Sequence, residues 1–444
     1  MKITPKNLAF LVVDIFSFYA ALFFAVLIRK GSGFSLDYYM QHVGPFTVLL
    51  VCWVVIFFII GFYDLRNFRK RFQRFKLLIT GAIVFYVVAI TIFYLSSAFE
   101  IAPKTILLLL IGGFGIINFS LREFLFKYLI KSAPITRILL IARGRDSEDL
   151  NNYLKDNEQL GYRVINWAKE EDGLRIKDLI ERGDFDLIVV SGTLKVNREI
   201  EAIIYERLLS GAEVMSFSDF YEMVFNKISI DELGEHWFLG SLKPRDGIYS
   251  IIKRLEDIAL AVFIFILTII FWPIIALIIK MASNGPAFFK DSRIGKNEKT
   301  FTFYKFRTMT MGSELVNKQE NSFGVKEVDK RVFGFGRLLR KVRADEWPQV
   351  VNILKGELSL IGPRADKEEF YSILKEQIPH YQIRTIALPG LTGWAQIHNK
   401  FGSSVEDARE RLAYDIYYIK NRSLGLDVAI ILKTAKTILT FSGI

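Results

Sequence analysis

The sequence predicts a membrane protein with three parts. These are a four-helix transmembrane bundle over 1–131, an α/β Rossmann-like cytoplasmic module over 132–247, and a mainly helical domain over 248–444 with a re-entrant membrane hairpin at about 255–279. Three observations lead to this architecture. Apolar runs crowd the N-terminal part, strand patterns alternate with helix patterns in the middle, and a further apolar run carries basic residues on both flanks.

The composition fits a chain that is partly embedded in lipid and partly soluble. Of the 444 residues, 51% are hydrophobic and the mean hydropathy is +0.28, yet charged residues still make up 24%. The net charge of +11 suits a surface that faces anionic lipid headgroups or phosphate-bearing substrates. No recognition motif supports a nucleic-acid partner. The single cysteine, Cys52, lies in an apolar run, which excludes a disulfide framework and a thiolate metal site.

Four N-terminal apolar runs are each close to the ~20 residues that a helix needs to cross a bilayer: 8–28, 46–63, 77–96 and 105–121. No small-residue cleavage site follows the first run, so we interpret it as an anchor rather than a signal peptide. Basic residues are dense at 64–76 and after residue 121, which places the N-terminus, that loop and the rest of the chain in the cytoplasm. Arg29 and Lys30 lie on the outer side and count against this orientation.

Strand and helix patterns alternate from residue 137 onward, which indicates a parallel α/β sheet. We expect strands at 138–141, 162–166 and 186–191, with helices at 147–158 and 174–182. A dinucleotide fingerprint would follow the first strand, but Gly144 is the single glycine there, and a fingerprint needs three. The module is either a nucleotide sensor or a structural, dimerising unit without a ligand. We favour the second reading.

The apolar segment 255–279 is long enough to span a bilayer, but its flanks argue for a hairpin. Lys253 and Arg254 precede it and further basic residues follow, which is the cytoplasmic signature on both sides. Pro273 lies inside the segment and is expected to kink the helix. Lys253 and Arg254 could pair with Asp257 on one helix face or contact lipid headgroups at the membrane interface, and we favour the headgroups. The C-terminal stretch 424–441 is typical of an amphipathic interfacial helix.

Asp345 and Glu346 are adjacent carboxylates at the start of an expected helix. Its apolar stripe would be Trp347, Val350, Val351 and Leu354. One interpretation is structural, with Asp345 as a cap and Glu346 as a first-turn acid that matches the helix dipole. The other is catalytic: the helix N-terminus lowers the pKa of Asp345, which then attacks phosphorus without a general base. Glu346 could then hold Mg²⁺, a cation that prefers oxygen ligands and is often shared with substrate phosphates.

Several basic residues could form a phosphate cradle around these carboxylates. Arg340 comes just before them, and Arg364 lies in a Gly-Pro-Arg turn, where a guanidinium can bind a phosphate with two hydrogen bonds. Lys305 and Arg307 are two residues apart on an expected strand and therefore share one face. The turn-rich segment 389–394 is either a structural loop or, through its Trp, a wall for a nucleotide base. The histidines are scattered and show no metal-ligand spacing.

Ordered blocks in the C-terminal half carry a family resemblance. They include Lys253-Arg254, Arg293-Ile294-Gly295-Lys296, Tyr304-Lys305-Phe306-Arg307, Asp345-Glu346-Trp347-Pro348-Gln349, Gly362-Pro363-Arg364 and Pro389-Gly390-Leu391-Thr392-Gly393-Trp394. Together they resemble the bacterial sugar transferase family, the polyprenyl-phosphate hexose-1-phosphate transferases or monotopic phosphoglycosyl transferases. The whole chain resembles the long form, which has four N-terminal membrane helices and initiates exopolysaccharide or O-antigen synthesis.

The resemblance implies a reaction and a set of roles. A sugar-1-phosphate would move from a UDP-sugar to undecaprenyl phosphate, with Asp345 as the nucleophile that forms a phosphosugar-aspartyl intermediate and releases UMP. Glu346 would be associated with Mg²⁺, and Arg340 and Arg364 would bind phosphate. The enzyme would act on the cytoplasmic face of the bacterial inner membrane, and a homodimer is a reasonable expectation. The departures from the family pattern are Glu357, Ala365, Leu388 and the His398-Asn399-Lys400 block; the last two bear on sugar or nucleotide specificity.

Two other classes of function remain for comparison. A non-catalytic membrane scaffold or sensor of polysaccharide assembly would not need the Asp345–Glu346 pair. A polytopic transporter usually carries ionisable pairs within its spans, and the apolar runs contain almost none beyond Asp14.

Overall fold

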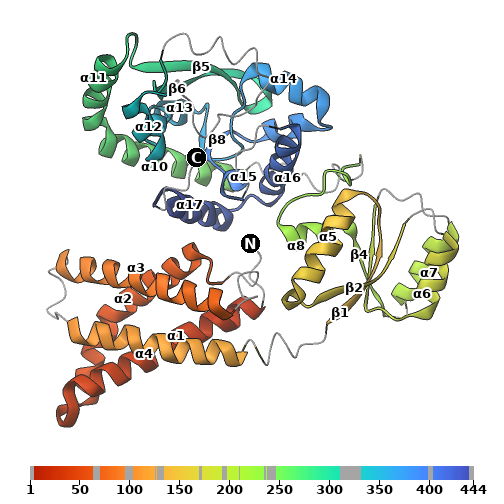
Figure 1. Ribbon diagram of the computed structural model, residues 1–444, viewed down its shortest axis with the longest axis horizontal. Helices are drawn as coiled ribbons and strands as arrows, with labels where there is room; N and C mark the ends of the chain where they lie inside the picture. Colours follow the sequence, from red (N-terminus) through yellow and green to blue (C-terminus); the bar gives the residue numbers. More distant parts are fainter. Residues whose placement is uncertain are drawn as a thin grey trace. The chain divides into compact units, whose positions relative to one another are not determined.

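A computed structural model of the chain describes residues 5–63, 71–95, 104–125, 127, 135–169, 173–192, 198–209, 211–234, 237, 247–310, 332–398 and 404–439. The chain divides into two compact units, Met1–Met215 and Ser216–Ile444 (Figure 1). The description below takes each unit by itself.

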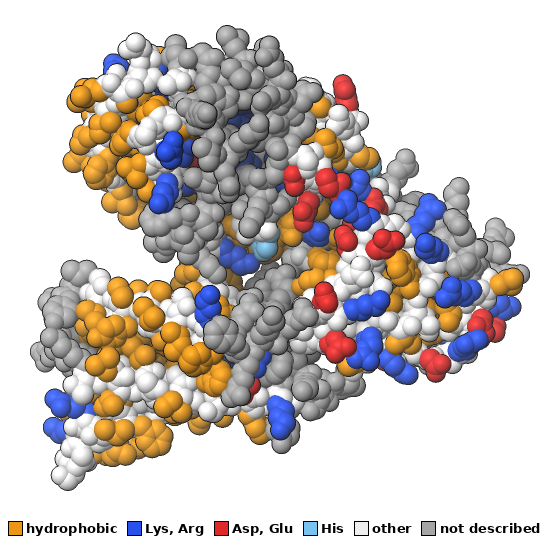
Figure 2. Space-filling model, viewed as in Figure 1, with side chains coloured by type: hydrophobic (Ala, Val, Ile, Leu, Met, Phe, Trp, Pro, Cys, Tyr) orange, Lys and Arg blue, Asp and Glu red, His pale blue; other side chains and the backbone are white. Residues whose placement is uncertain are grey.

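Long apolar helices form the N-terminal part of the first unit: α1 (Pro5–Lys30), α2 (Leu36–Ile60), α3 (Arg71–Leu95) and α4 (Lys104–Leu125). They share one apolar core, in which Trp53 lies edge-on to Phe85 and Phe114 with ring centroids 4.4 and 4.2 Å away. By length and composition each is a candidate membrane span. Figure 2 shows hydrophobic side chains over much of their outer surface. These helices are those of a membrane protein, as the sequence predicts.

A four-stranded sheet follows, with strand order β2-β1-β3-β4. Its strands are β1 (Thr136–Ile141), β2 (Tyr162–Ala168), β3 (Leu187–Val190) and β4 (Glu213–Ser216), and its helices are α5 (Arg145–Asp156), α6 (Gly173–Arg182) and α7 (Arg198–Leu209). The three strands expected from the sequence are present, and β1 runs parallel to both β2 and β3. Gly144 enters α5 with φ of 90°, a conformation that costs glycine little.

The second unit contains the elements of the expected C-terminal domain and, before them, α8. They are α8 (Phe217–Phe225), α10 (Ile248–Thr268), α11 (Trp272–Ala282), β5 (Phe288–Ile294), β6 (Thr300–Phe306), α12 (Gly334–Lys341), α13 (Val350–Lys355), β7 (Ser359–Ile361), α14 (Glu368–Gln377), β8 (Gly390–Thr392), α15 (Trp394–His398), α16 (Val405–Asn421) and α17 (Leu424–Leu439), with 3₁₀ turns η5 (Ile269–Phe271), η8 (Ala344–Gln349) and η9 (Tyr381–Ile386). Strands β5 and β6 pair antiparallel, and β7 and β8 pair parallel.

The boundary between the units differs from the expected boundary at 247. Ile228, Ile230 and Leu233 are buried in the core of the second unit, and the Ile228 N–H donates to the Ala413 carbonyl at 3.1 Å. Residues 216–234 therefore pack with the C-terminal domain, because their apolar side chains find a core there.

The apolar segment after residue 248 is an interrupted helix. Helix α10 ends at Thr268, and α11 begins at Trp272 with Pro273 in its first turn, where the missing N–H needs no intrahelical partner. The break therefore lies just before the proline that was expected to kink the helix. Ala261 of α10 packs in one core cluster of the second unit, and Ile275 and Ile279 of α11 pack in another. Both arms of the segment are thus attached to the same unit.

Candidate active site

The adjacent carboxylates lie in a 3₁₀ turn that is locked into the core. Arg343 enters η8 with φ of 58°, an uncommon conformation for a residue with a side chain, and its carbonyl accepts the Glu346 N–H at 3.3 Å. Ala344 is fully buried beside them, and Asp345 is only 8% exposed. The turn therefore presents both carboxylates from a fixed backbone.

The apolar stripe expected for this region is wrong in detail. Val350 and Ile353 face the main core, while Trp347 packs against a separate cluster and Leu354 is exposed. The cause is the 3₁₀ geometry of η8, which has three residues per turn and shifts the phase of the helix that follows.

Asn352 joins α13, the helix that follows the Asp345–Glu346 pair (the dyad), to strand β6. Its side-chain amide donates to the Thr302 carbonyl and to the Glu357 carboxylate, both at 2.6 Å, and its Oδ1 accepts the Tyr304 N–H at 3.3 Å. Asn352 is fully buried, so these bonds are strong constraints. They bring Lys305 of β6 to the dyad, and they give Glu357, a departure from the family pattern, a structural role.

The pKa of Asp345 is shifted opposite to the sequence expectation. Burial, followed by repulsion from Glu346, raises the pKa of Asp345 to about 6, although Lys305, Arg340 and Arg343 oppose the shift. The expected lowering by a helix N-terminus is therefore wrong, because desolvation of the carboxylate outweighs it. At neutral pH the carboxylate is still mostly ionised.

Glu346 responds in the opposite direction. Burial alone would raise its pKa, but Arg364 and Arg343 outweigh burial and lower it. The Arg364 Nη2 donates to Glu346 Oε1 at 3.2 Å, and Arg343 Nη1 lies 3.5 Å from the same oxygen. The pKa values of the two neighbouring acids are thereby moved apart, with that of Glu346 lowered and that of Asp345 raised.

Three of the predicted basic residues, Lys305, Arg340 and Arg364, lie close enough to interact with the two carboxylates. Burial, together with repulsion from Arg293, lowers the pKa of Lys305 to about 8, while the Asp345 charge opposes the shift. Arg340 Nε donates to Thr308 Oγ1 at 2.9 Å and also acts on the pKa of Asp345. Lys305, Arg340 and Arg364 thus form a cationic wall beside the two carboxylates.

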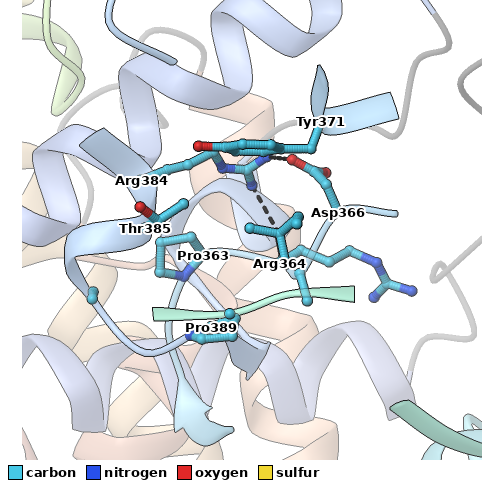
Figure 3. A pocket seen from close by; sticks show the side chains of 11 residues that line it. Pro363, Arg364, Asp366, Tyr371, Arg384, Thr385 and Pro389 are labelled. Atoms are coloured by element: carbon cyan, nitrogen blue, oxygen red, sulfur yellow. Dashed lines mark hydrogen bonds and ion pairs between the residues drawn. The ribbon is translucent and has the colours of Figure 1, made fainter. Parts of the chain in front are cut away.

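The Gly362-Pro363-Arg364 turn is held against the 389–393 segment. A Cβ on Gly362 would lie 2.2 Å from the Leu388 carbonyl oxygen, so only glycine allows the two backbones this close. Behind the turn, Arg384 Nη2 donates to the Arg364 carbonyl at 2.9 Å, and Arg384 Nη1 binds the Asp366 carboxylate. Figure 3 shows Arg384, Asp366 and Arg364 around a small hollow that Tyr371 and Thr385 also line.

Trp394 has the position expected for a structural loop, the first of the two alternatives for segment 389–394. Its ring is 2% exposed, and its Nε1–H donates to the Asn226 carbonyl at 2.8 Å. The ring therefore packs in the core and does not form an open wall for a nucleotide base.

Two other sequence candidates, Arg307 and Lys253, bind groups of the protein other than Asp345 and Glu346. Arg307 donates to the Ser283 and Asn284 carbonyls at 2.6 and 2.8 Å and fixes the end of α11. The Lys253 ammonium lies 3.2 Å from Asp257 and 3.5 Å from Asp427. The pairing of Lys253 with Asp257 on one helix face, the alternative that we ranked second, is the arrangement found.

Arg254 is also engaged by protein groups. Its Nη1 and Nη2 donate to the carbonyls of Ile353 and Leu354 at 2.7 and 3.0 Å. The contact that we had favoured, with lipid headgroups, thus competes with two hydrogen bonds inside the unit. Pro273 lies at the break between α10 and α11.

Arg293 was not among the predicted site residues. It lies in β5, its Nη1 donates to the Ala365 carbonyl at 2.9 Å, and burial followed by nearby Arg364 lowers its pKa. It therefore backs the turn that carries Arg364. Its presence in the Arg293-Ile294-Gly295-Lys296 block was the available sequence signal, but a charge on a strand is most often exposed.

The described residues contain no cluster of three or more side chains that could form a complete metal cage. A divalent cation with oxygen ligands is commonly held by one or two carboxylates and completed by substrate phosphates and water. Asp345 and Glu346, whose like charges repel each other, fit that second kind of site.

Comparison with known proteins identifies the family. A sequence model described as "Bacterial sugar transferase" matches residues 248–441. The exopolysaccharide production protein PSS of Rhizobium leguminosarum bv. phaseoli is 35% identical over 195 residues, which cover 96% of that protein and 43% of this chain. The chain belongs to the bacterial sugar transferase family.

Longer relatives carry enzyme names. The UDP-N-acetylgalactosamine-undecaprenyl-phosphate N-acetylgalactosaminephosphotransferase of Aeromonas hydrophila is 40% identical over 248 residues, 55% of this chain and 56% of that protein. The UDP-glucose:undecaprenyl-phosphate glucose-1-phosphate transferase of Xanthomonas campestris pv. campestris is 26% identical over 347 residues, 72% of this chain and 70% of that protein. The second alignment is longer than the family match, so this sugar transferase resembles it upstream of residue 248 as well. All the blocks named above lie within 248–441, as does the dyad.

Proposed function

We propose that this sugar transferase moves a sugar-1-phosphate from a UDP-sugar to undecaprenyl phosphate in two steps, through a covalent intermediate on Asp345. The observation that carries the proposal is the Asp345–Glu346 pair within a wall of cations. One carboxylate is fixed as a charge by arginines, and the other is a more basic oxygen nucleophile. Relatives whose names state this overall transfer support the substrate classes.

In the first step, Asp345 attacks the phosphorus that bears the sugar. A bond forms between the carboxylate oxygen and that phosphorus, the bridging P–O bond of the diphosphate breaks, and its electron pair leaves with UMP. Arg340, Lys305 and Arg364 are the cations that would stabilise the charge on the phosphoryl oxygens.

In the second step, a phosphate oxygen of undecaprenyl phosphate attacks the same phosphorus. The aspartyl–phosphorus bond breaks, Asp345 regains its charge, and the product is a sugar diphosphate linked to the lipid. A stored intermediate allows one site to receive a water-soluble donor first and a lipid acceptor second, without holding both together.

Glu346 is the residue that would hold a magnesium ion at this site, together with the donor phosphates. When bound, Mg²⁺ would neutralise negative charge on the diphosphate. Residues of this chain orient the two carboxylates. Arg364 donates to one oxygen of Glu346, and Lys305 and Arg340 lie near Asp345.

We also propose that α10 and α11 form a re-entrant hairpin that enters and leaves the same leaflet. Both arms pack on one compact unit, and the exposed residues around the break, among them Phe263, Ile266 and Ile270, are apolar. A hairpin of this kind would place the site at the cytoplasmic face of the inner membrane, where the acceptor phosphate lies.

The decisive experiment measures UMP release and label transfer separately. Membranes or bilayer nanodiscs with the full chain receive a panel of UDP-sugars and Mg²⁺, with no polyprenyl phosphate. We expect at most one UMP per protein molecule from the correct donor, and a radiolabelled sugar phosphate that remains on the protein. Addition of undecaprenyl phosphate then moves the label into lipid.

Asp345→Asn should abolish both UMP release and labelling, whereas Lys355→Met, at an exposed position of α13, should change neither. Normal labelling of the Asp345→Asn protein would exclude Asp345 as the nucleophile. Transfer to lipid without any labelled protein would exclude the two-step route.

A further inference from the structure

A carboxylate of α10 holds the strand that leads into the Arg364 turn. Asp257 Oδ1 accepts the backbone N–H of Leu360 in β7 at 2.9 Å, and β7 ends at Ile361, three residues before Arg364. Asp257 is only 1% exposed. A hydrogen bond from a backbone N–H to a buried carboxylate is stronger than a neutral one, and its loss would leave that N–H unpaired. Asp257 therefore fixes one arm of the site.

The other arm is held one turn earlier on the same helix. Arg254 donates to the carbonyls of Ile353 and Leu354 at the C-terminal end of α13, and α13 continues directly from the η8 turn that carries the dyad. The last carbonyls of a helix lack i+4 N–H partners, and the guanidinium supplies donors here, although the Ile353 carbonyl also accepts the Gly356 N–H at 3.0 Å. Arg254 thus fixes the helix whose first residues follow Asp345 and Glu346.

Charge neutralisation keeps this part of α10 in place. The Lys253 ammonium lies 3.2 Å from Asp257 and 3.5 Å from Asp427 of α17, and Asp427 also accepts the Tyr418 hydroxyl at 2.9 Å. The Asp257 carboxylate therefore keeps one orientation, because rotating it would separate the ion pair with Lys253 in a region of low dielectric.

The remainder of α10, residues 262–268, carries no charged side chain. Beyond Ala261 its outer side chains are apolar and exposed, with Phe263 60% and Ile266 65% accessible. One continuous helix therefore carries a lipid-facing half and a half that is bonded to both arms of the catalytic site.

We propose that α10 positions the two arms relative to each other, and that Asp257 and Arg254 are positioning residues which set the contact between Arg364 and Glu346. The proposal rests on the proposed function and concerns its first step. Asp257 acts through β7 on Arg364, and Arg254 acts through α13 on Glu346. Neither side chain touches the dyad, so their effect on the first step passes through the 3.2 Å contact of Arg364 with Glu346.

A double-mutant cycle tests the proposal on the full chain in bilayer nanodiscs. The readout is single-turnover UMP release from UDP-sugar without polyprenyl phosphate. Asp257→Ala should lower the rate at least ~10-fold, and Arg254→Lys, which can replace only one of the two carbonyl bonds, about 5-fold. In an Arg364→Ala background the contact is already absent, so either substitution should lower the rate less than ~2-fold further.

The matched control is Ile266→Ala on the lipid-facing half of α10, which should stay within ~2-fold of wild type. Arg254 and Asp257 contact different arms of the site, so Arg254→Lys alone tests the proposal if the Asp257→Ala protein does not fold. The inference is overturned if the folded variants keep wild-type rates, or if their losses multiply fully with that of Arg364→Ala, which is the behaviour of a merely structural residue. Failure of the wild-type protein to release UMP would instead refute the proposed function itself.

Discussion

Arg384 supports the backbone of Arg364 from the side opposite the dyad. Its Nη2 donates to the Arg364 carbonyl at 2.9 Å and also reaches the Asp415 carboxylate at 2.9 Å, and Nη1 binds Asp366. Arg384 is 4% exposed, and burial raises the pKa of Asp415 to about 6 against the opposing effect of Arg384. A buried cation thus holds two acids and the Gly362-Pro363-Arg364 turn together.

Replacement of Arg384 should therefore destabilise the second unit. Arg384→Met leaves Asp366 and Asp415 buried without their main cation, a change that typically costs about 3–5 kcal/mol of the free energy of unfolding. Thermal and denaturant unfolding of the detergent-solubilised chain would measure it. Arg384→Met combined with Asp415→Asn should recover part of the loss, because one uncompensated charge is removed. An unchanged unfolding midpoint in the single variant would contradict this role.

The pH dependence of the first step should be bell-shaped. Asp345 has a pKa of about 6, so it gains a proton and loses nucleophilicity as the pH falls through 6, and the rate should fall ~10-fold for each pH unit below that. Lys305 has a pKa of about 8 and loses its charge above it, which should lower the rate on the alkaline side. Single-turnover UMP release from pH 5 to 9 measures both limbs. A constant rate down to pH 5 would exclude an Asp345 pKa near 6 in the donor complex.

Two substitutions of Lys305 should distinguish the acid limb of the pH–rate profile from its alkaline limb. Lys305→Met removes a cation that favours ionised Asp345, so the acid limb should move to higher pH and the alkaline limb should disappear. Lys305→Arg keeps a charge throughout this range, so the acid limb should stay in place while the alkaline limb disappears. The measurement is again the pH profile of UMP release. Retention of the alkaline limb in both variants would assign it to another group.

The dyad and part of its cationic wall were predictable, because short local patterns in the sequence carry them. Asp345, Glu346, Arg340 and Arg364 needed only local sequence, and Lys305 needed only the period of a strand. Whether these residues carry out the roles implied by the family resemblance stays a prediction, which the kinetic experiments test.

The supporting residues could not be predicted, because their partners are distant in the sequence. Arg384 binds Asp415, and Asp257 binds the backbone of Leu360; neither pairing has a local pattern. The pKa of Asp345 was predicted with the wrong sign for a related reason. A helix N-terminus is visible in sequence, whereas burial of the carboxylate depends on the tertiary packing around it.

The proposed re-entrant path of α10 and α11 predicts a specific labelling pattern. In a Cys52→Ser background, cysteines at Leu174 and Lys296 lie before and after the hairpin, and both should react with an impermeant maleimide from the cytoplasmic face of inverted vesicles. Gly33, between α1 and α2, is the opposite-face control and should react only from the other side. Labelling of Lys296 together with Gly33 would show that the segment spans the bilayer.

Asp14 should be a structural residue of the N-terminal helices. It is fully buried in α1, and both of its oxygens lie 2.7 Å from Arg122 Nη2 of α4, while the Arg122 guanidinium also lies 4.0 Å over the Phe62 ring. Such a closed pair accounts for an ionisable residue in an apolar run without a transport pathway.

Asp14→Leu should leave the buried Arg122 guanidinium without its carboxylate partner and should destabilise the first unit by about 3–5 kcal/mol. Asp14→Leu with Arg122→Leu should recover most of that loss, because neither charge then remains in an apolar core. Thermal unfolding in nanodiscs, followed by tryptophan fluorescence of Trp53 in the same helical core, would measure both variants. If the double variant is as unstable as the single one, the cost comes from lost packing around Phe62 rather than from the charge left without its carboxylate partner.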